Sequence, residues 1–278
     1  MWRFVFKYFN KRGDAVRLKT LILSVLLFSW QTGLQAQHKS VVQTYGNQNE
    51  AIIDQTGSLN PHMADVYQNG NQNIATIYQE GNGHKASSDD GAVGIEPFGV
   101  LQDGNQHRAT IEQYGEDARA EILQYEGNKN DASILQHASG SVLGKIEMAG
   151  SENVASFDQT GQNIIAEALM IGNQNQVSLL QSGGVNLQAA FYLNGNNNLI
   201  EATQTGSDND LGNASAWGVQ QLGNNNQAYL TQDGQQNTLR LIQNGNNNMA
   251  DIIQQGTGHS ATVTQSGNNN NVTITQTN

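Results

Sequence analysis

The chain contains no cysteine, only two prolines among 278 residues, and few charged (13%) or aromatic (6%) residues. Without cysteine it has no disulfide framework, no thiolate zinc site and no thiol nucleophile. The low charge excludes a charged, disordered polymer. The chain is instead rich in amides, because asparagine and glutamine make up about a quarter of the residues after position 36, and ordinary globular domains carry more leucine, lysine and glutamate.

The first 36 residues differ from the rest of the chain. They hold six of the 13 basic residues, ahead of a short apolar run at residues 21–30. A run of about ten residues is too short to span a membrane, and Leu34 and Ala36 stand at the −3 and −1 positions before Gln37. This order is typical of a secretory signal peptide and predicts cleavage between Ala36 and Gln37. An N-terminal membrane anchor is the alternative interpretation.

Residues 37–278 carry seven basic and 23 acidic side chains. A chain with this acidic balance repels nucleic acid and anionic membranes. The sequence therefore predicts no nucleic-acid partner, and no membrane insertion after the signal peptide is removed.

Glutamine recurs at steps of 11 to 13 residues, or about twice that. Filling the doubled steps with Asp90, Met148, Met170 and Leu193 gives 21 equivalent positions, 17 of them glutamine. The position two before is almost always apolar, four before is usually alanine, six before is often asparagine, and two after is glycine in 16 cases. The unit is therefore N-x-A-x-I-x-Q-x-G-x-x. The glutamines are Gln43, Gln55, Gln68, Gln79, Gln102, Gln113, Gln124, Gln136, Gln159, Gln181, Gln204, Gln221, Gln232, Gln243, Gln254, Gln265 and Gln276.

A spacing of two places these residues on one face of a β-strand. The unit predicts a strand of about seven residues followed by a tight turn in which glycine supplies positive φ. The turn glycines are Gly57, Gly70, Gly81, Gly104, Gly115, Gly161, Gly172, Gly183, Gly195, Gly234, Gly245, Gly256 and Gly267. The core-facing asparagines are Asn49, Asn73, Asn130, Asn153, Asn175, Asn198, Asn226, Asn237, Asn248 and Asn270.

Alternate rows differ at the position six before glutamine, which predicts coils of two strands and a period of 22–23 residues. The fold class is thus an all-β solenoid, a cross-β stack in which asparagine and glutamine amides pair between coils. His62, His84 and His107 are predicted to stack on successive coils. They either replace asparagine in an amide ladder or form a metal or pH-sensing site.

The unit Q-x-G-x-x-N-x-A-x-I-x-Q, seen at Gln68–Gln79, Gln124–Gln136 and Gln243–Gln254, resembles the curlin repeat. The likeness extends over about residues 41–276. It implies a subunit of curli, the amyloid fibres of bacterial biofilm matrix, exported through a dedicated outer-membrane channel with accessory proteins and polymerising outside the cell with itself and related curlin subunits. The subunits implied by the resemblance have about five repeats, whereas this chain has about ten.

The function expected is structural: self-assembly into extracellular fibres for adhesion and biofilm, with no catalytic residues, no cofactor and no metal. The alternative is a monomeric secreted solenoid that binds glycan or ice through a regular outer face. The last strand, at residues 272–278, and the first repeat, at Val41 and Gln43, leave no room for caps. Two open strand edges favour head-to-tail filaments.

Overall fold

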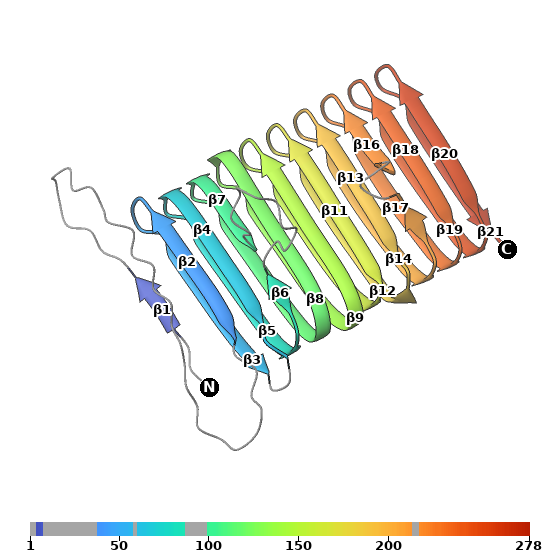
Figure 1. Cartoon of the computed structure of the whole chain (residues 1–278). Coiled ribbons are helices and arrows are strands. Elements are labelled where there is room, and N and C mark those ends of the chain that lie inside the picture. The colour runs from blue at the N-terminus through green and yellow to red at the C-terminus, as the bar shows by residue number, and fades with distance from the viewer. Residues whose placement is uncertain (1–3, 8–37, 58–59, 87–98, 213–216) are drawn as a thin grey trace.

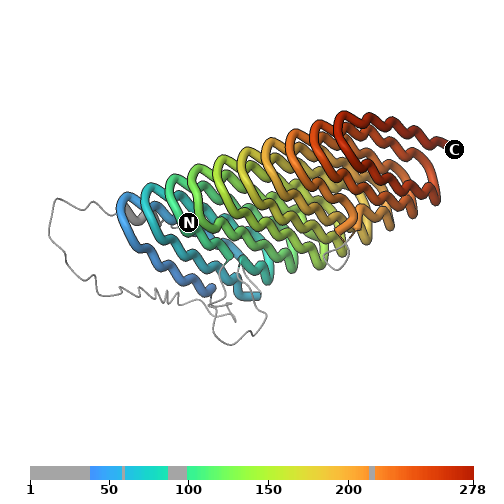
Figure 2. Tube along the Cα trace, turned by 90° about the horizontal axis from the view of Figure 1, so that it is seen from above, coloured from blue at the N-terminus to red at the C-terminus, as the bar shows by residue number. Residues whose placement is uncertain are grey.

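The chain folds as one long stack of β-coils (Figures 1 and 2). The structure is a computed structural model that describes residues 4–7, 38–57, 60–86, 99–212 and 217–278. Within these residues every regular element is a strand, and the strands form about ten coils. All coil-to-coil pairings are parallel, as the repeat predicts. The all-β solenoid expected from the sequence is therefore confirmed.

Each coil contributes one strand to each of two sheets, which pack face to face. The front sheet in Figure 1 contains β2 (Lys39–Tyr45), β4 (Met63–Asn71), β6 (Lys85–Ala86), β7 (Val100–Asn105), β11 (Ile164–Ile171), β13 (Gln188–Asn194), β15 (Asp210–Leu211), β16 (Val219–Leu222), β18 (Thr238–Asn244) and β20 (Ser260–Ser266). The back sheet contains β3 (Glu50–Gly57), β5 (Ile74–Asn82), β10 (Val154–Gln162), β12 (Gln176–Val185), β14 (Leu199–Ser207), β17 (Gln227–Gln235), β19 (Met249–Thr257) and β21 (Asn271–Thr277). The long strands β8 (Arg108–Asn128) and β9 (Asp131–Ala149) cross from the back sheet to the front sheet.

The core lies between the two sheets and follows the alternation in the sequence. In β19, Ala250, Ile252 and Gln254 are buried, whereas Asp251 and Ile253 between them are partly exposed. The alanine and isoleucine columns form one apolar cluster along the stack, from Val42 to Ile274. Burial of these columns holds the two sheets together, since apolar burial contributes about 25 cal/mol per Å².

Two insertions interrupt the period on the front sheet. β6 and β7 together make one row, because Ala86 pairs with Ala64 and Val100 pairs with Val66. Gly99 re-enters the ladder at this row, and its amide donates to the Asp65 carbonyl at 3.0 Å. β15 and β16 make a second split row of the same design, in which Gly218 re-enters the ladder.

The predicted row at Asp90 is therefore wrong. Asp90 lies in the segment 87–98, outside the described residues, and the chain on either side of that segment completes a single row. Counting an extra row there reversed the predicted assignment of strands to sheets for the coils before it. Local periodicity cannot detect this, because an insertion of 12 residues is close in length to one repeat.

The strand β1 (Phe4–Lys7) pairs antiparallel with β3 and lies at the N-terminal end of the stack (Figure 1). This segment belongs to the predicted signal peptide.

Candidate functional site: ladders and edges of the coil stack

A column of glutamine side chains runs the length of the back sheet. Gln55 Nε2 donates to Gln79 Oε1 at 2.8 Å, and Gln79 Nε2 donates to Gln113 Oε1 at 2.7 Å. Gln79 Nε2 also donates to the Met63 carbonyl on the facing strand, at 3.1 Å, so each amide joins both coils and sheets. The column is Gln55, Gln79, Gln113, Gln136, Gln159, Gln181, Gln204, Gln232, Gln254 and Gln276.

The glutamine column of the front sheet is broken into two segments. The first is Gln68, Gln102 and Gln124, and the second is Gln221, Gln243 and Gln265. Between them the same position is filled by Met148, Met170 and Leu193, which are fully buried. Nε2 always donates toward the next coil, so the first glutamine of each segment keeps an unpaired Oε1. Gln68 Oε1 and Gln221 Oε1 are indeed buried without a hydrogen-bond partner.

The predicted ladder position of Gln43 is wrong by one residue. β2 pairs with β4 so that Thr44 stands opposite Gln68, whereas Gln43 stands opposite Tyr67 on the outer face. Val42, not Val41, packs against the core. A shift of one residue turns a strand's other face inward, and burial of Val42 favours this register. Because Thr44 and not a glutamine occupies the ladder position before Gln68, Gln68 Oε1 has no amide donor.

A column of asparagines fills the corner where each back strand begins. Asn226 Nδ2 donates to the Gly245 carbonyl at 2.9 Å, and Asn226 Oδ1 accepts the backbone N–H of Asn248 at 3.1 Å. Each side chain therefore satisfies backbone groups that a tight turn leaves unpaired. The column is Asn49, Asn73, His107, Asn130, Asn153, Asn175, Asn198, Asn226, Asn248 and Asn270.

The opposite corner has a mixed column, and it corrects the predicted grouping of histidines. The column is His38, His62, His84, Ala118, Val142, Ile164, Leu187, Asn209, Asn237 and His259. His107 is not part of it, because the insertion before β7 places His107 in the asparagine column. The three rings that do stack are His38, His62 and His84, with centroids 4.7 and 5.1 Å apart. Asn209 also belongs to this column, because its Oδ1 accepts the backbone N–H of Asn237 at 3.0 Å.

These histidines act as asparagine does in the other corner. His62 Nδ1 accepts the His84 backbone N–H at 3.2 Å, and Nε2 lies 3.2 Å from the Thr56 carbonyl. These bonds assign the proton to Nε2. Desolvation by burial lowers the pKa of His62 from 6.5 to about 4, and it also lowers the pKa of His38, His84 and His107. No group of three or more His, Cys, Asp or Glu side chains among the described residues could hold a metal ion.

The turn glycines are required chiefly by the close approach of successive coils. A Cβ on Gly245 would lie 1.9 Å from the carbonyl oxygen of Gly267, and one on Gly70 would lie 1.8 Å from that of Gly104. Most of the predicted glycines also have positive φ, as expected. Gly57 does not, although its Cβ would lie 2.1 Å from the Gly81 oxygen. Its role in the turn is therefore steric.

A second asparagine column, which the repeat unit did not predict, lies on the outside of one turn. Asn224 Nδ2 and the Asn224 backbone N–H both donate to Asn246 Oδ1, at 3.1 and 2.9 Å. The column comprises Asn47, Asn71, Asn105, Asn128, Ser151, Asn173, Asn196, Asn224, Asn246 and Asn268. The signal that could have revealed it is the recurrence of asparagine directly after the turn glycine.

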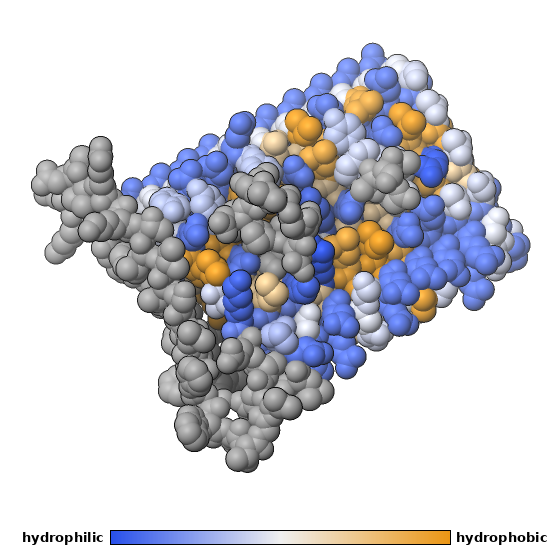
Figure 3. Space-filling model, in the orientation of Figure 1, coloured by the Kyte–Doolittle hydropathy of each residue, from blue (hydrophilic) through white to orange (hydrophobic). Residues whose placement is uncertain are grey.

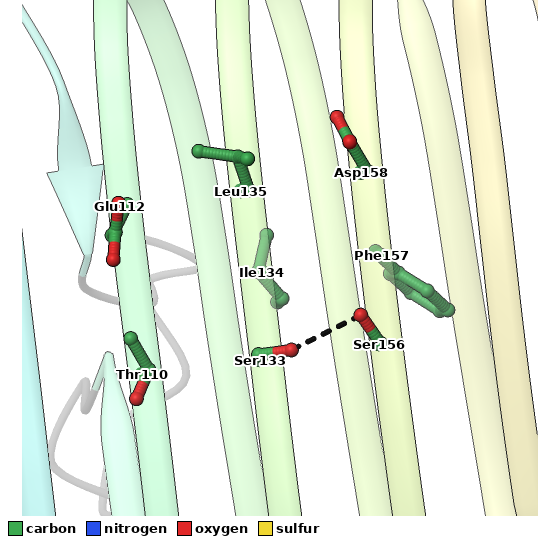
Figure 4. A pocket seen from close by; sticks show the side chains of 8 residues that line it. All are labelled: Thr110, Glu112, Ser133, Ile134, Leu135, Ser156, Phe157 and Asp158. Atoms are coloured by element: carbon green, nitrogen blue, oxygen red, sulfur yellow. Dashed lines mark hydrogen bonds between the residues drawn. The ribbon is translucent and has the colours of Figure 1, made fainter.

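The outer faces are less regular than the core. On the back sheet one outward column begins with Ile52, then carries five hydroxyl side chains, and continues with Glu201, Tyr229 and Asp251. The hydroxyl residues are Thr76, Thr110, Ser133, Ser156 and Ser178. A shallow depression lies beside them (Figure 4), lined by Thr110, Glu112, Ser133, Ile134, Leu135, Ser156, Phe157 and Asp158.

The front face mixes apolar and charged side chains. Figure 3 shows hydrophilic residues along the rims of the stack and apolar patches in the middle of this face. Lys145 Nζ lies 3.4 Å from Oε2 of Glu121, which occupies the preceding row. Glu167 lies opposite Lys145 in the following row. Burial is the largest cause of the raised pKa of Glu167; Lys145 lowers this pKa, and the neighbouring Glu121 raises it.

The two ends of the stack carry complementary groups. At the C-terminal end, β20 pairs with β18 and β21 pairs with β19, and Val272 and Ile274 are only partly buried. At the N-terminal end, β2 pairs with β4, and β3 pairs with β5 and β1. Since Nε2 donates toward the C-terminus in every row, the back column presents an Oε1 at Gln55 and an Nε2 at Gln276.

The predicted cleavage site, Ala36 and Gln37, lies outside the described residues. Within the described part of the chain, no helix has the length and apolar character needed to cross a membrane.

The comparisons with known proteins agree with the geometry. The family described as curlin associated repeat matches residues 63–87 and 245–277, which cover β4 to β6 and β19 to β21. No curated protein matches the chain. Both matched segments contain the glutamine, glycine, asparagine and alanine columns described above. The chain therefore carries the curlin associated repeat in these two segments.

Proposed function

We infer that the protein is a structural subunit that self-assembles, end to end, into extracellular curli-like amyloid fibres for adhesion and biofilm matrix. The observation that carries this inference is the continuity of the back glutamine column and of the asparagine corner column, each of which ends in a group that its own first row can pair with. Gln276 Nε2 matches Gln55 Oε1, and Asn270 Oδ1 matches the backbone N–H of Asn49. A second copy stacked on either end extends these two columns without a new kind of contact, and a heterologous contact that does not close gives a filament.

The physical basis is the cost of leaving the ends open. A buried acceptor or donor without a partner costs about 1–3 kcal/mol, and a paired one contributes about 0.5–1.5 kcal/mol. An open parallel strand edge also recruits other strands. Stacking of a second copy satisfies these groups and covers Val272 and Ile274, which the last coil leaves partly exposed.

The irregular outer faces argue against the alternative of a monomeric ice- or glycan-binding solenoid. Such a function needs a uniform outward array, and the hydroxyl column on the back sheet is bounded by Ile52 and Glu201. A catalytic role has no support in the outer faces, which carry no cleft lined by convergent acid and base groups within the described residues.

The two curlin associated repeat matches also support a secretion route. We propose that residues 1–36 are a signal peptide and that the chain leaves the cell through a curli-type outer-membrane channel with accessory proteins. Mass spectrometry of extracellular material should find Gln37 as the N-terminus. An intact N-terminus in protein retained by the cell would contradict this part of the proposal.

The assembly proposal is tested with the chain that begins at Gln37. It should form fibres that bind thioflavin and diffract at about 4.7–4.8 Å along the fibre axis. Gln254→Leu should slow growth more than Gln255→Leu, because Gln254 Nε2 donates to Gln276 Oε1 at 2.8 Å whereas Gln255 is exposed. A monomer that stays folded and never elongates, or equal effects of the two substitutions, would contradict assembly through the ladders.

The growing edge can be tested separately. The Met249 N–H donates to the Asn270 carbonyl, and backbone groups alternate in direction along a strand, so the N–H groups of Val272 and Ile274 point toward β19 and those of Thr273 and Thr275 point away from it. Proline at Thr273 and Thr275 therefore removes backbone donors from the open edge of β21, and a chain with both substitutions should retain the circular dichroism of the folded monomer but elongate much more slowly. Unchanged growth of that variant would show that assembly does not proceed through the C-terminal edge.

A further inference from the structure

The corner column that begins with histidine at the N-terminal end also finishes with histidine at the C-terminal end. We propose that the joint between subunits is a histidine joint, in which His259 of one copy accepts the backbone N–H of His38 of the next copy, so that protonation of His259 blocks the joint. This inference rests on the proposed end-to-end assembly and names the partner surface, a second copy of this chain, and its regulation by protons.

The rule for this column is visible inside the chain. The side chain of each polar row accepts the backbone N–H of the following row: His38 Nδ1 accepts from His62 at 3.1 Å, and Asn237 Oδ1 accepts from His259 at 2.9 Å. The reverse bond runs beside it, since the Thr238 backbone N–H donates to the His259 carbonyl at 2.8 Å. A second copy in the same register would present His38 to His259 in the same way.

The hydrogen bonds of His259 fix the tautomer that the joint needs. Its Nε2 lies 3.0 Å from the Gln255 carbonyl and donates to it, which leaves Nδ1 as the acceptor. In the interior rows the same arrangement holds, with Nε2 of His84 lying 3.0 Å from the Glu80 carbonyl and Nδ1 accepting a backbone N–H. A proton on Nδ1 of His259 replaces the acceptor with a donor that points at the incoming N–H.

Few other titratable groups face this position. Within its own copy, the His259 backbone N–H donates to Asn237 Oδ1 and its Nε2 donates to the Gln255 carbonyl, neither of which titrates. The side-chain amide of Asn278 also lies close, since a Cβ on Gly256 would meet both Asn278 Oδ1 and His259 Nε2. The charged residues of β18 and β19, Arg240 and Asp251, occupy outward positions. Across the joint, the facing titratable group is His38, whose ring stacks on His62 at 4.7 Å, while Lys39 is exposed on the outer side.

A cationic imidazole at His259 is therefore placed against a second imidazole, that of His38 in the next copy. The other corner of the same joint uses Asn270 Oδ1, as Asn248 Oδ1 is used inside the chain, at 3.0 Å from the next N–H. That corner has no proton-sensitive group. The pH dependence of joining is thus concentrated in the histidine corner, at His259.

The test compares fibre elongation of the chain from Gln37 onward at about pH 7.5 and about pH 5, using preformed seeds and matched monomer concentrations. Wild-type growth should fall roughly tenfold at the lower pH, because a proton on Nδ1 of His259 removes the acceptor of the joint. His259→Asn should grow at nearly the same rate at both, since asparagine already occupies this column at Asn237. Circular dichroism of the monomer at each pH shows that the coils remain folded.

His62→Asn is the matched control, because it removes a histidine from the interior of the same column. It should keep the wild-type loss of growth at low pH. If His259→Asn keeps that loss and His62→Asn removes it, the joint is not the proton-sensitive element and the inference is wrong. Fibre growth that is independent of pH in the wild type also overturns the inference while leaving the proposed assembly intact, whereas absence of fibres at pH 7.5 overturns the proposed function itself.

Discussion

The break in the front glutamine column makes a quantitative prediction about two chemically identical substitutions. Gln243 lies in the middle of a ladder segment: its Oε1 accepts from Gln221 at 2.9 Å and its Nε2 donates to Gln265 at 2.8 Å. Gln221 begins the segment, and its Oε1 already lies buried against Leu193 without a partner. Replacement of each glutamine by leucine therefore has different consequences for the remaining amides.

Gln243→Leu leaves two buried acceptors unpaired, Gln221 Oε1 as before and Gln265 Oε1 in addition, and it also leaves one N–H of Gln221 Nε2 without its acceptor. Gln221→Leu removes one unpaired acceptor and creates another, at Gln243 Oε1, so the number of unpaired acceptors is unchanged. Both variants also lose one bond to a facing carbonyl, at Leu199 or Gln227. Since a buried unpaired group costs about 1–3 kcal/mol, Gln243→Leu should destabilise its coils by at least that much more than Gln221→Leu.

The assay is native-state hydrogen exchange on the soluble chain before assembly, followed by mass spectrometry of peptides from β16 to β20. A difference of 1–3 kcal/mol corresponds to about 5- to 150-fold faster exchange in Gln243→Leu than in Gln221→Leu. Repeat stacks lose stability locally, so the effect should be concentrated in these coils. Equal exchange in the two variants, or faster exchange in Gln221→Leu, would refute the hydrogen-bond accounting.

Three further predictions follow from individual rows. Thr44→Gln supplies a donor to the unpaired Gln68 Oε1, so it should raise the urea midpoint of the soluble chain and slow hydrogen exchange in β2 and β4. No increase in the midpoint would mean that Thr44 is not in the ladder register. Gly245→Ala places Cβ 1.9 Å from the Gly267 oxygen and should lower the midpoint far more than Gly258→Ala, whose Cβ would have no neighbour within 4 Å; similar losses would show that strain in φ, not coil spacing, requires glycine. Burial lowers the pKa of four histidines, His38, His62, His84 and His107, below the value in the unfolded chain. The unfolded chain therefore binds more protons at low pH, so the stability of the folded chain should be full above about pH 6.5 and fall toward pH 4. The urea midpoint should fall over the same pH range, and a midpoint that does not change with pH would contradict this prediction.

The sequence by itself determined the strand, the turn and the composition of the core. Alternation with a period of two is a property of a single strand, so Ala250, Ile252 and Gln254 could be assigned to the inner face without a partner strand. The glutamine columns from Gln55 to Gln276 could be predicted for the same reason. Each repeat carries all the residues that its own row needs, and identical rows stack on one another.

Only the tertiary structure decided which rows are neighbours. His107 leaves the histidine column, and Asn209 enters that column, because each insertion lies within one row and the chain returns to complete it at Gly99 and Gly218. Thr44 takes the place of Gln43 because the register of the first strand is set by packing of Val42 against the next coil. Periodicity is local, whereas register and the pairing of rows depend on contacts between segments 22 to 34 residues apart, and those contacts exist only once the coils have stacked.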